Sequence, residues 1–324
     1  MTTAGERAMA QMAATVGAPK HPKPFLNPRR REGITGYFFA LPFIIGFLTL
    51  TLGPMLFSLY ASFSDYNITS PPRWIGLDNY DFILTQDGRF RTSLGNTVYY
   101  VALKTPVIII ISLALAMLMR VGVPGRRVFR TIYYLPSILT GVSAIFLWIW
   151  VLSPRGILNE GLGAVGVAGP NWFFDPEWTK PGLVVMQLWT IGTPLLIMLA
   201  GLNGIPRDLY EAAELDGAGP LRKFVNITIP MLSPTLLFLI VTNIIFAFQV
   251  FNSAYVISTT VGATKSPGEP AQSLLFYEVY LYLRAFRDLE MGFASALAWI
   301  LFFIIMVVTG IQLWLSKRWV YYET

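Results

Sequence analysis

The side chains of this chain exclude several kinds of chemistry. It has no cysteine and one histidine, His21, which lies in a polar N-terminal stretch. The sequence therefore offers no thiolate, no disulfide and no His/Cys metal site, and a Ser-His-Asp triad would have to borrow His21 from that stretch. No G-x-x-x-x-G-K-S/T motif occurs, so we do not expect the chain to hydrolyse nucleotide. We predict no catalytic residue and no cofactor in this chain, which is not expected to be an enzyme.

The polar side chains that remain informative lie within apolar segments, where they are costly and usually face a bundle interior or a wet cavity. The richest segment, residues 232–257, includes Phe246, Gln249, Asn252 and Tyr255. Phe246, Gln249 and Asn252 are three residues apart, so on one helix they would share a face. Amides hydrogen-bond to hydroxyls and rings stack on C–H faces, so this stripe suits a saccharide. Hydrogen bonding between helices is the alternative.

Lys104 is the one charged residue deep in an apolar segment. It lies about ten residues into segment 94–119, roughly 15 Å from the outer end at the helical rise. An unpaired ammonium there needs an anion or a wet cavity. No acidic residue occurs in the apolar segments, so the partner is another subunit, water or the substrate. A substrate partner would favour an acidic saccharide, such as a uronate oligosaccharide of the alginate kind, or a sugar phosphate. Trp189 and Thr193 in segment 182–203 are further pathway candidates.

The elements that must position these residues are long apolar helices. Apolar residues make up 54% of the 324 positions and charged residues only 13%. Runs of about 20 apolar residues predict transmembrane helices. We therefore expect an all-α, polytopic membrane protein with six transmembrane helices, at residues 36–63, 94–119, 132–152, 182–203, 232–257 and 291–316. Residues 274–283 predict an additional amphipathic helix at the outer surface.

The orientation of these helices follows from lysine and arginine, which are enriched in cytoplasmic loops. With the N-terminus inside, the cytoplasmic segments hold fifteen of these residues and the outer loops hold eight. Both termini and the loop 206–230 are therefore predicted to be cytoplasmic. This asymmetry also accounts for the net charge of +6, so no nucleic-acid partner is needed.

The loop 206–230 predicts two short helices joined by a glycine. Pro206 and Asp208 suit a first helical turn, where a missing N–H is harmless and a negative charge meets the helix dipole. Gly217 supplies a turn that other residues make at a cost, and Pro220 suits the start of the second helix. Two short helices at a sharp angle would form a rigid plug for a groove on another protein. An ordinary interfacial connector is the alternative interpretation.

The spacing in this loop resembles a known motif. Glu211-Ala212-Ala213, then Gly217, then Ile227-Thr228-Ile229-Pro230 is similar to the EAA loop of bacterial ABC importer permeases, which usually have Leu in place of Ile229. The chain also resembles the carbohydrate branch of that family, in particular the larger maltose permease, and the likeness extends over roughly residues 33–317. Further matches are Trp74 to Tyr80, Asn96-Thr97 and Asn171 to Pro176.

The resemblance implies a function and a set of partners. The chain would be one of two membrane subunits of a binding-protein-dependent carbohydrate importer, with the type I ABC importer permease fold, in the inner membrane of a bacterium. Its partners would be a second, homologous permease in a heterodimer, two ATPase subunits that carry ATP and Mg²⁺, an external binding protein, a saccharide and membrane lipid. The residues expected to couple to the ATPase are Glu211, Ala212, Ala213, Asp216 and Gly217.

Composition and the resemblance together suggest a division of the chain. Residues 1–32 are rich in Ala, Pro and Lys/Arg, which predicts a flexible cytoplasmic tail. The resemblance implies that residues 33–92 are an accessory first helix with its outer loop and that residues 93–324 are the core permease domain. An importer of a neutral sugar or a sugar phosphate remains an alternative. An ion-coupled secondary transporter would want acidic residues within the membrane, and the sequence has none there.

Overall fold

The computed structural model describes residues 28–120, 126–138, 141–261 and 266–321, together with Gly5 and Met9. His21 and most of the predicted tail 1–32 lie outside the described residues. The chain divides into two compact units, residues 1–57 and 58–324. Residues 58–92 belong to the second unit.

The first unit is built on one apolar helical stretch. It contains α2 (Pro28–Phe47), a π-helical turn at Leu48–Leu52 and the start of α3 (Gly53–Ser62). The stretch Thr35–Ser62 has 28 residues and a mean hydropathy of 1.9, which is long and apolar enough to cross a membrane. The π-turn precedes Pro54, whose ring would clash with a carbonyl one turn earlier in a regular α-helix. The widened turn accommodates this proline, and the same arrangement recurs at Phe224–Thr228 before Pro230.

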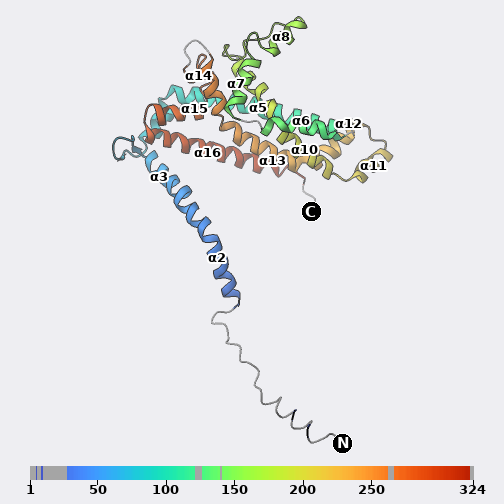
Figure 1. Cartoon of the computed structure of the whole chain (residues 1–324), viewed down its shortest axis with the longest axis horizontal. Helices are drawn as coiled ribbons and strands as arrows, with labels where there is room; N and C mark the ends of the chain where they lie inside the picture. The colour runs from blue at the N-terminus through green and yellow to red at the C-terminus, as the bar shows by residue number, and fades with distance from the viewer. Residues whose placement is uncertain are drawn as a thin grey trace. The chain divides into compact units, whose positions relative to one another are not determined.

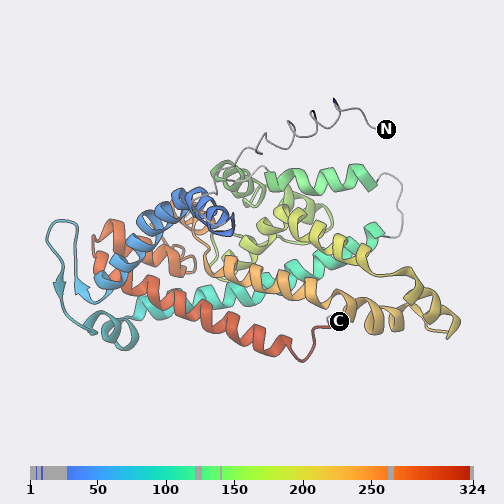
Figure 2. The same cartoon turned by 90° about the horizontal axis from the view of Figure 1, so that it is seen from below.

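Long helices run through the second unit and connect its two ends. Figure 1 and Figure 2 show α11 (Arg207–Leu215) and α12 (Pro220–Lys223) at one end and α15 (Tyr277–Tyr282) at the other. The helices that run between these ends, or along part of that length, are α5 (Gly88–Arg120), α10 (Gly192–Gly204), α13 (Ile229–Phe248) and α16 (Met291–Ser316). By length and composition, the described residues contain four helices that could cross a membrane, or five if the bent α9–α10 pair is one span.

Apolar packing holds α5, α10 and α13 together. Buried residues from the three helices include Ala116, Leu199 and Leu232. Gly201 of α10 lies so close to α13 that an added Cβ would be 2.7 Å from Leu232 Cδ1. A side chain at this position would have to displace the side chains of Leu232 and Thr235, so the glycine favours the close contact of the two helices.

Three of the predicted spans are interrupted. The segment 132–152 is divided between α6 (Arg126–Ile138) and α7 (Val142–Val151), with Gly141 at a positive φ of 107° before α7. The segment 182–203 consists of α9 (Thr179–Gln187), a 3₁₀ turn (Leu188–Thr190) and α10, and the chain bends by 58° between α9 and α10. The segment 232–257 stops at Phe248 and resumes as α14 (Asn252–Thr260).

The α15 end differs from the expectation of a helix at the outer surface. Residues 274–283 are largely buried, and Tyr277 and Tyr280 are among the largest buried side chains. Asn96 of α5 donates its amide N–H groups to the carbonyls of Gln272 and Leu275, which fixes this segment on α5. The segment belongs to the core because its aromatic residues cover the first turns of α5. The remaining elements are α4 (Asp78–Thr85), α8 (Ile157–Ala164), a π-turn at Leu283–Arg287 and an antiparallel pair of short strands, β1 (Ser64–Asp65) and β2 (Arg73–Trp74).

Candidate functional site

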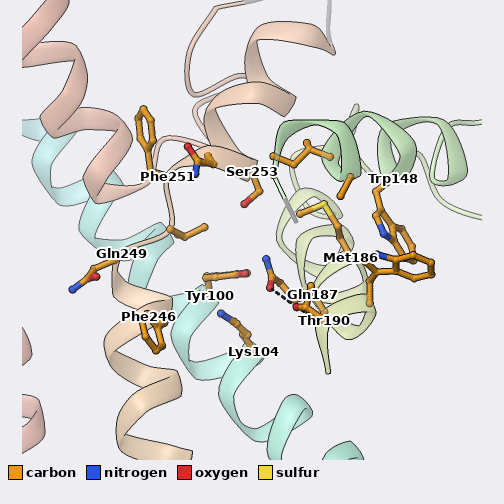
Figure 3. Close-up of a pocket in the computed structure, with 16 residues that line it drawn as sticks. Tyr100, Lys104, Trp148, Met186, Gln187, Thr190, Phe246, Gln249, Phe251 and Ser253 are labelled. Atoms are coloured by element: carbon orange, nitrogen blue, oxygen red, sulfur yellow. Dashed lines mark hydrogen bonds between the residues drawn. The ribbon is translucent and has the colours of Figure 1, made fainter. Parts of the chain in front are cut away.

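A cavity of about 390 Å³ lies where the interrupted helices meet. Its walls come from α5, α7, the α9–α10 bend, the end of α13 and the start of α14. Figure 3 shows these side chains arranged around the cavity. The lining combines aromatic, amide and hydroxyl groups with one ammonium and contains no carboxylate. The predicted pathway residues that line it are Lys104, Trp189, Phe246, Gln249 and Asn252.

Lys104 lies beside a tyrosine on the same helix. Its Nζ is 5.6 Å from the centroid of the Tyr100 ring, one turn earlier on α5. Figure 3 shows Tyr100, Lys104 and Gln187 close together on one side of the cavity. No carboxylate forms an ion pair with Lys104 in the part of the chain that the structure describes. The cation–π contact compensates only part of the desolvation of an ammonium, so the site retains a capacity for an anion.

Two further polar groups of the cavity lack partners. The Tyr100 hydroxyl and the Trp148 indole N–H are buried and make no hydrogen bond to any described residue. Buried polar atoms are rarely left unpaired, because an unmade hydrogen bond is costly. Both groups therefore lack a partner among the described residues in this conformation of the cavity wall. Sequence analysis missed Tyr100 and Trp148, although Tyr100 is four residues before Lys104 and therefore shares its helix face.

The predicted stripe of Phe246, Gln249 and Asn252 is not one face of a continuous helix. Helix α13 ends at Phe248, Gln249 has a non-helical ψ of 33°, and α14 begins at Asn252. The three side chains still line the same cavity, and all three are exposed, Phe246 to 67%. In Figure 3, Gln249 extends away from Tyr100 and Lys104. The break thus spreads these residues along an open wall of the cavity.

Two of the predicted pathway residues do not line the cavity. Thr193 is exposed on α10, beyond the bend that carries Trp189. Tyr255 is half-buried and stacks on Phe251, with ring centroids 5.3 Å apart, and it also contacts Tyr282 at 5.2 Å. Tyr255 therefore helps to pack α14 against α15 in this structure. Trp189 does line the cavity, and its ring packs edge-on against Trp148 at 5.9 Å.

The predicted two-helix loop is present as α11 and α12. Pro206 caps α11, and Pro220 is the first residue of α12. Gly217 has a φ of +74° and donates its N–H to the Glu214 carbonyl, while the Ala218 N–H bonds to the Ala213 carbonyl. These two bonds, with a glycine in the left-handed region, are the usual way to end a helix sharply. The angle between α11 and α12 therefore depends on Gly217.

The α11–α12 loop presents an exposed, mixed surface. Glu211, Ala212 and Asp216 are exposed, Ala213 is half-buried, and Leu215 is 90% exposed. Glu214 forms an ion pair of 2.6 Å with Lys223, which ties α11 to α12. A rigid turn with exposed leucine and carboxylate side chains suits insertion into a groove on another protein.

Comparison with known proteins identifies the family. The family model described as binding-protein-dependent transport system inner membrane component matches residues 82–321. The chain belongs to this family. Its members are non-catalytic membrane subunits of ABC transporters, and the family implies a partner permease, an ATPase and a substrate-binding protein.

Individual relatives narrow the assignment to carbohydrate import. The permease is 38% identical to the probable ABC transporter permease protein YesP of Bacillus subtilis, over 91% of this chain and 94% of that protein. It is 31% identical to the arabinooligosaccharides transport system permease protein AraP of the same species, over 86% of this chain and 88% of that protein. A solved bacterial alginate ABC transporter, in complex with an alginate pentasaccharide-bound periplasmic protein, contains a chain of the same fold. The TM-score is 0.73 at 24% identity, covering 89% of this chain and 96% of that one. This protein is thus a carbohydrate-importing ABC permease of the inner membrane.

Proposed function

We propose that this permease carries an acidic saccharide and that Lys104 contacts its anionic group. The observation that carries the proposal is an ammonium in the cavity wall that no described carboxylate pairs with. A uronate carboxylate would supply the missing counter-charge, and the Tyr100 hydroxyl and Gln187 amide lie beside it for further hydrogen bonds. A neutral sugar would leave the ammonium to water or to a group on another subunit.

The relatives support a saccharide as the cargo, but the saccharides that they are named for differ in charge. AraP is named for arabinooligosaccharides, which are neutral, whereas the solved transporter of the same fold carries alginate, a polymer of uronates. The orphaned hydroxyl and indole groups of the cavity suit either cargo. Lys104 is the feature that favours the acidic class.

The open wall of the cavity supports the proposal that a second permease subunit packs against this one. Phe246 and Gln249 line the cavity yet are exposed. We expect a homologous but different permease to cover this wall and to supply the other half of the pathway. Two ATPase subunits with bound ATP and Mg²⁺ would take up the α11–α12 loops of the two permeases, and Glu211, Ala212, Ala213, Asp216 and Gly217 are the proposed coupling residues. An external binding protein would deliver the saccharide.

The proposed topology has six membrane crossings with both termini in the cytoplasm. The excess of lysine and arginine on one side supports it. The backbone N–H of Tyr321 also bonds to Ser233 Oγ at 2.9 Å, which brings the C-terminal segment to the start of α13, near the α11–α12 loop. Because the chain has no cysteine, a single cysteine at Leu215 can test the topology. It should react with an impermeant maleimide from the cytoplasmic side only, and labelling from outside would refute this orientation.

Reconstitution tests the substrate class. The permease would be co-expressed with the second permease, ATPase and binding protein encoded beside it and placed in proteoliposomes. We expect a uronate oligosaccharide to stimulate ATP hydrolysis and to enter the vesicles, and a neutral oligosaccharide of equal length to do so far less. Stimulation by neutral sugars alone would contradict the acidic class. Full transport by the lone chain would instead indicate a secondary transporter.

A further inference from the structure

One side chain of α11 connects the exposed loop to two other helices. Arg120, the last residue of α5, donates from Nη1 to the Tyr210 hydroxyl at 2.9 Å, and its guanidinium carbon lies 4.7 Å from the Tyr210 ring centroid. The same hydroxyl is 2.9 Å from Thr228 Oγ1 in the π-turn that leads into α13. Tyr210 therefore contacts the end of α5 and the start of α13 through one oxygen atom.

The hydroxyls of Tyr210 and Thr228 form the centre of this cluster. The Tyr210 oxygen accepts from Arg120, and either hydroxyl can donate to the other across the 2.9 Å between them. Thr228 Oγ1 also lies 3.5 Å from the Lys223 carbonyl, a longer and weaker contact. Thr228 is only 5% exposed, so loss of its partner would leave a poorly solvated oxygen.

Tyr210 attaches α11 to the bundle. No residue of α11 is buried, and Leu209, Glu211 and Ala212 on either side of Tyr210 are exposed. The Tyr210 ring packs against the apolar cluster of α5, α10 and α13, while its hydroxyl makes the two bonds described above. This side chain thus contributes to the orientation of α11 relative to α5, together with the buried Ile205 just before α11 and the Glu214–Lys223 ion pair.

Helix α5 carries this attachment to the cavity. Lys104 lies 16 positions before Arg120, about 24 Å away along a continuous helix at 1.5 Å per residue. Helix α13 leads from Thr228 to Phe246 and the break at Gln249. The two helices that carry Lys104 and Phe246, α5 and α13, therefore each have one end in contact with Tyr210.

We propose that Arg120, Tyr210 and Thr228 form a link that makes α11 move as one body with α5 and α13 when the ATPase displaces the loop. Tyr210 is a positioning residue, which acts on the cavity through the helices and does not touch the substrate. The proposal rests on the proposed docking of the ATPase at the α11–α12 loop and is independent of the charge of the saccharide.

Removal of one hydroxyl tests the link. Tyr210→Phe keeps the ring and loses both hydrogen bonds, so in the reconstituted complex we expect substrate-stimulated ATP hydrolysis and transport to fall roughly threefold to tenfold. Basal ATP hydrolysis and the yield of assembled complex should stay near wild type. Tyr321→Phe is the control, because Tyr321 is 55% exposed and its hydroxyl makes no hydrogen bond to the residues that the structure describes. Wild-type stimulation in Tyr210→Phe would overturn the proposal.

A double-mutant cycle separates the link from general destabilisation. Arg120→Met and Tyr210→Phe break the same interaction, so the double variant should lose little more coupling than the worse single variant. Thr228→Val keeps the shape of the side chain and the bond from Arg120 to Tyr210, so it should reduce coupling in the same direction as Tyr210→Phe but by less. Losses of Arg120→Met and Tyr210→Phe that simply add would show that the two residues act independently and would contradict the link.

Distance measurements test the motion itself. Spin labels at Leu118→Cys on α5 and Leu209→Cys on α11, both exposed positions, report the separation of the two helices. We expect the distance distribution to stay the same when a non-hydrolysable ATP analogue is added to the wild-type complex, and to shift or broaden in Tyr210→Phe. A shift in the wild type itself would overturn the proposal. Docking of the ATPase at the loop is tested separately, by co-purification. If the ATPase does not co-purify with the wild-type permease, the docking itself is refuted and not the link.

Discussion

The Tyr280 hydroxyl donates a hydrogen bond of 2.5 Å to Asp87 Oδ2, although 193 positions separate the two residues. The other carboxylate oxygen of Asp87 accepts the backbone N–H groups of Arg89 and Phe90 and thereby caps the first turn of α5. This bond fastens α15 to one end of α5, as Tyr210 fastens α11 to the other. Helix α5 is thus held by a side-chain hydrogen bond at each end, with the cavity residues between them.

The bond between Tyr280 and Asp87 should contribute to stability. Asp87 is 7% exposed and Tyr280 is 2% exposed, so Tyr280→Phe leaves a buried carboxylate oxygen without its donor. We expect this variant to lose about 1–3 kcal/mol of the free energy of unfolding. Thermal unfolding of the purified permease in detergent measures the loss, with the exposed Tyr321→Phe as the matched control. Equal stability of the two variants would argue that water replaces the lost bond.

Gly217 offers a graded test of the loop geometry. At a φ of +74°, a Cβ would meet nothing within 4 Å, so the cost of substitution is conformational. Asn tolerates this region better than Ala, and Pro cannot adopt it and also lacks the N–H that bonds to Glu214. Substrate-stimulated ATP hydrolysis should therefore decrease in the order Gly, Asn, Ala, Pro, with coupling abolished in Gly217→Pro while membrane insertion is retained. Wild-type coupling in Gly217→Pro would refute a role for the angle between α11 and α12.

Lys104 provides the test of substrate charge. Lys104→Met removes the ammonium, and charge-assisted hydrogen bonds are about twice as strong as neutral ones. Transport of a uronate oligosaccharide should fall about tenfold or more, whereas assembly and basal ATP hydrolysis should be near normal. Lys104→Arg, which keeps the charge, should retain part of the activity. Loss of assembly would indicate an ion pair with the partner subunit, and equal effects on acidic and neutral saccharides would contradict recognition of charge.

The loop was predictable because its geometry is local. Pro206, Gly217 and Pro220 each restrict the backbone at their own position, and the structure places the cap, the turn and the second helix at these residues. The break after Phe248 was not predictable, since residues 246–252 contain neither glycine nor proline and read as one apolar span.

The polar contacts between distant segments were also beyond the sequence. Tyr210 and Arg120 are 90 positions apart, and each alone is an ordinary interfacial residue. In the sequence, Tyr100 is an aromatic residue in a long apolar segment, a pattern typical of a core residue. In the structure it is fully buried. Only the fold shows that its hydroxyl is unpaired and borders the cavity.

Gln249 and Asn252 test whether the open wall of the cavity contacts the saccharide. Each amide can make hydrogen bonds to sugar hydroxyls, and each neutral bond is worth about 0.5–1.5 kcal/mol. The double variant Gln249→Ala with Asn252→Ala should therefore lower transport several-fold, without changing the affinity of the separate binding protein for the saccharide. Weak binding at this wall also suits a protein that must release its cargo.

Asn243→Ala is the matched control for this pair. Its amide donates to the Leu239 carbonyl of its own helix at 2.9 Å, and Asn243 does not line the cavity. This variant should transport normally. Single cysteines at positions 249 and 252 should in addition be protected from maleimide by substrate, because the saccharide would cover both side chains. Normal transport by the double variant, together with labelling that substrate does not change, would mean that these amides serve the contact between the two permeases and not the cargo.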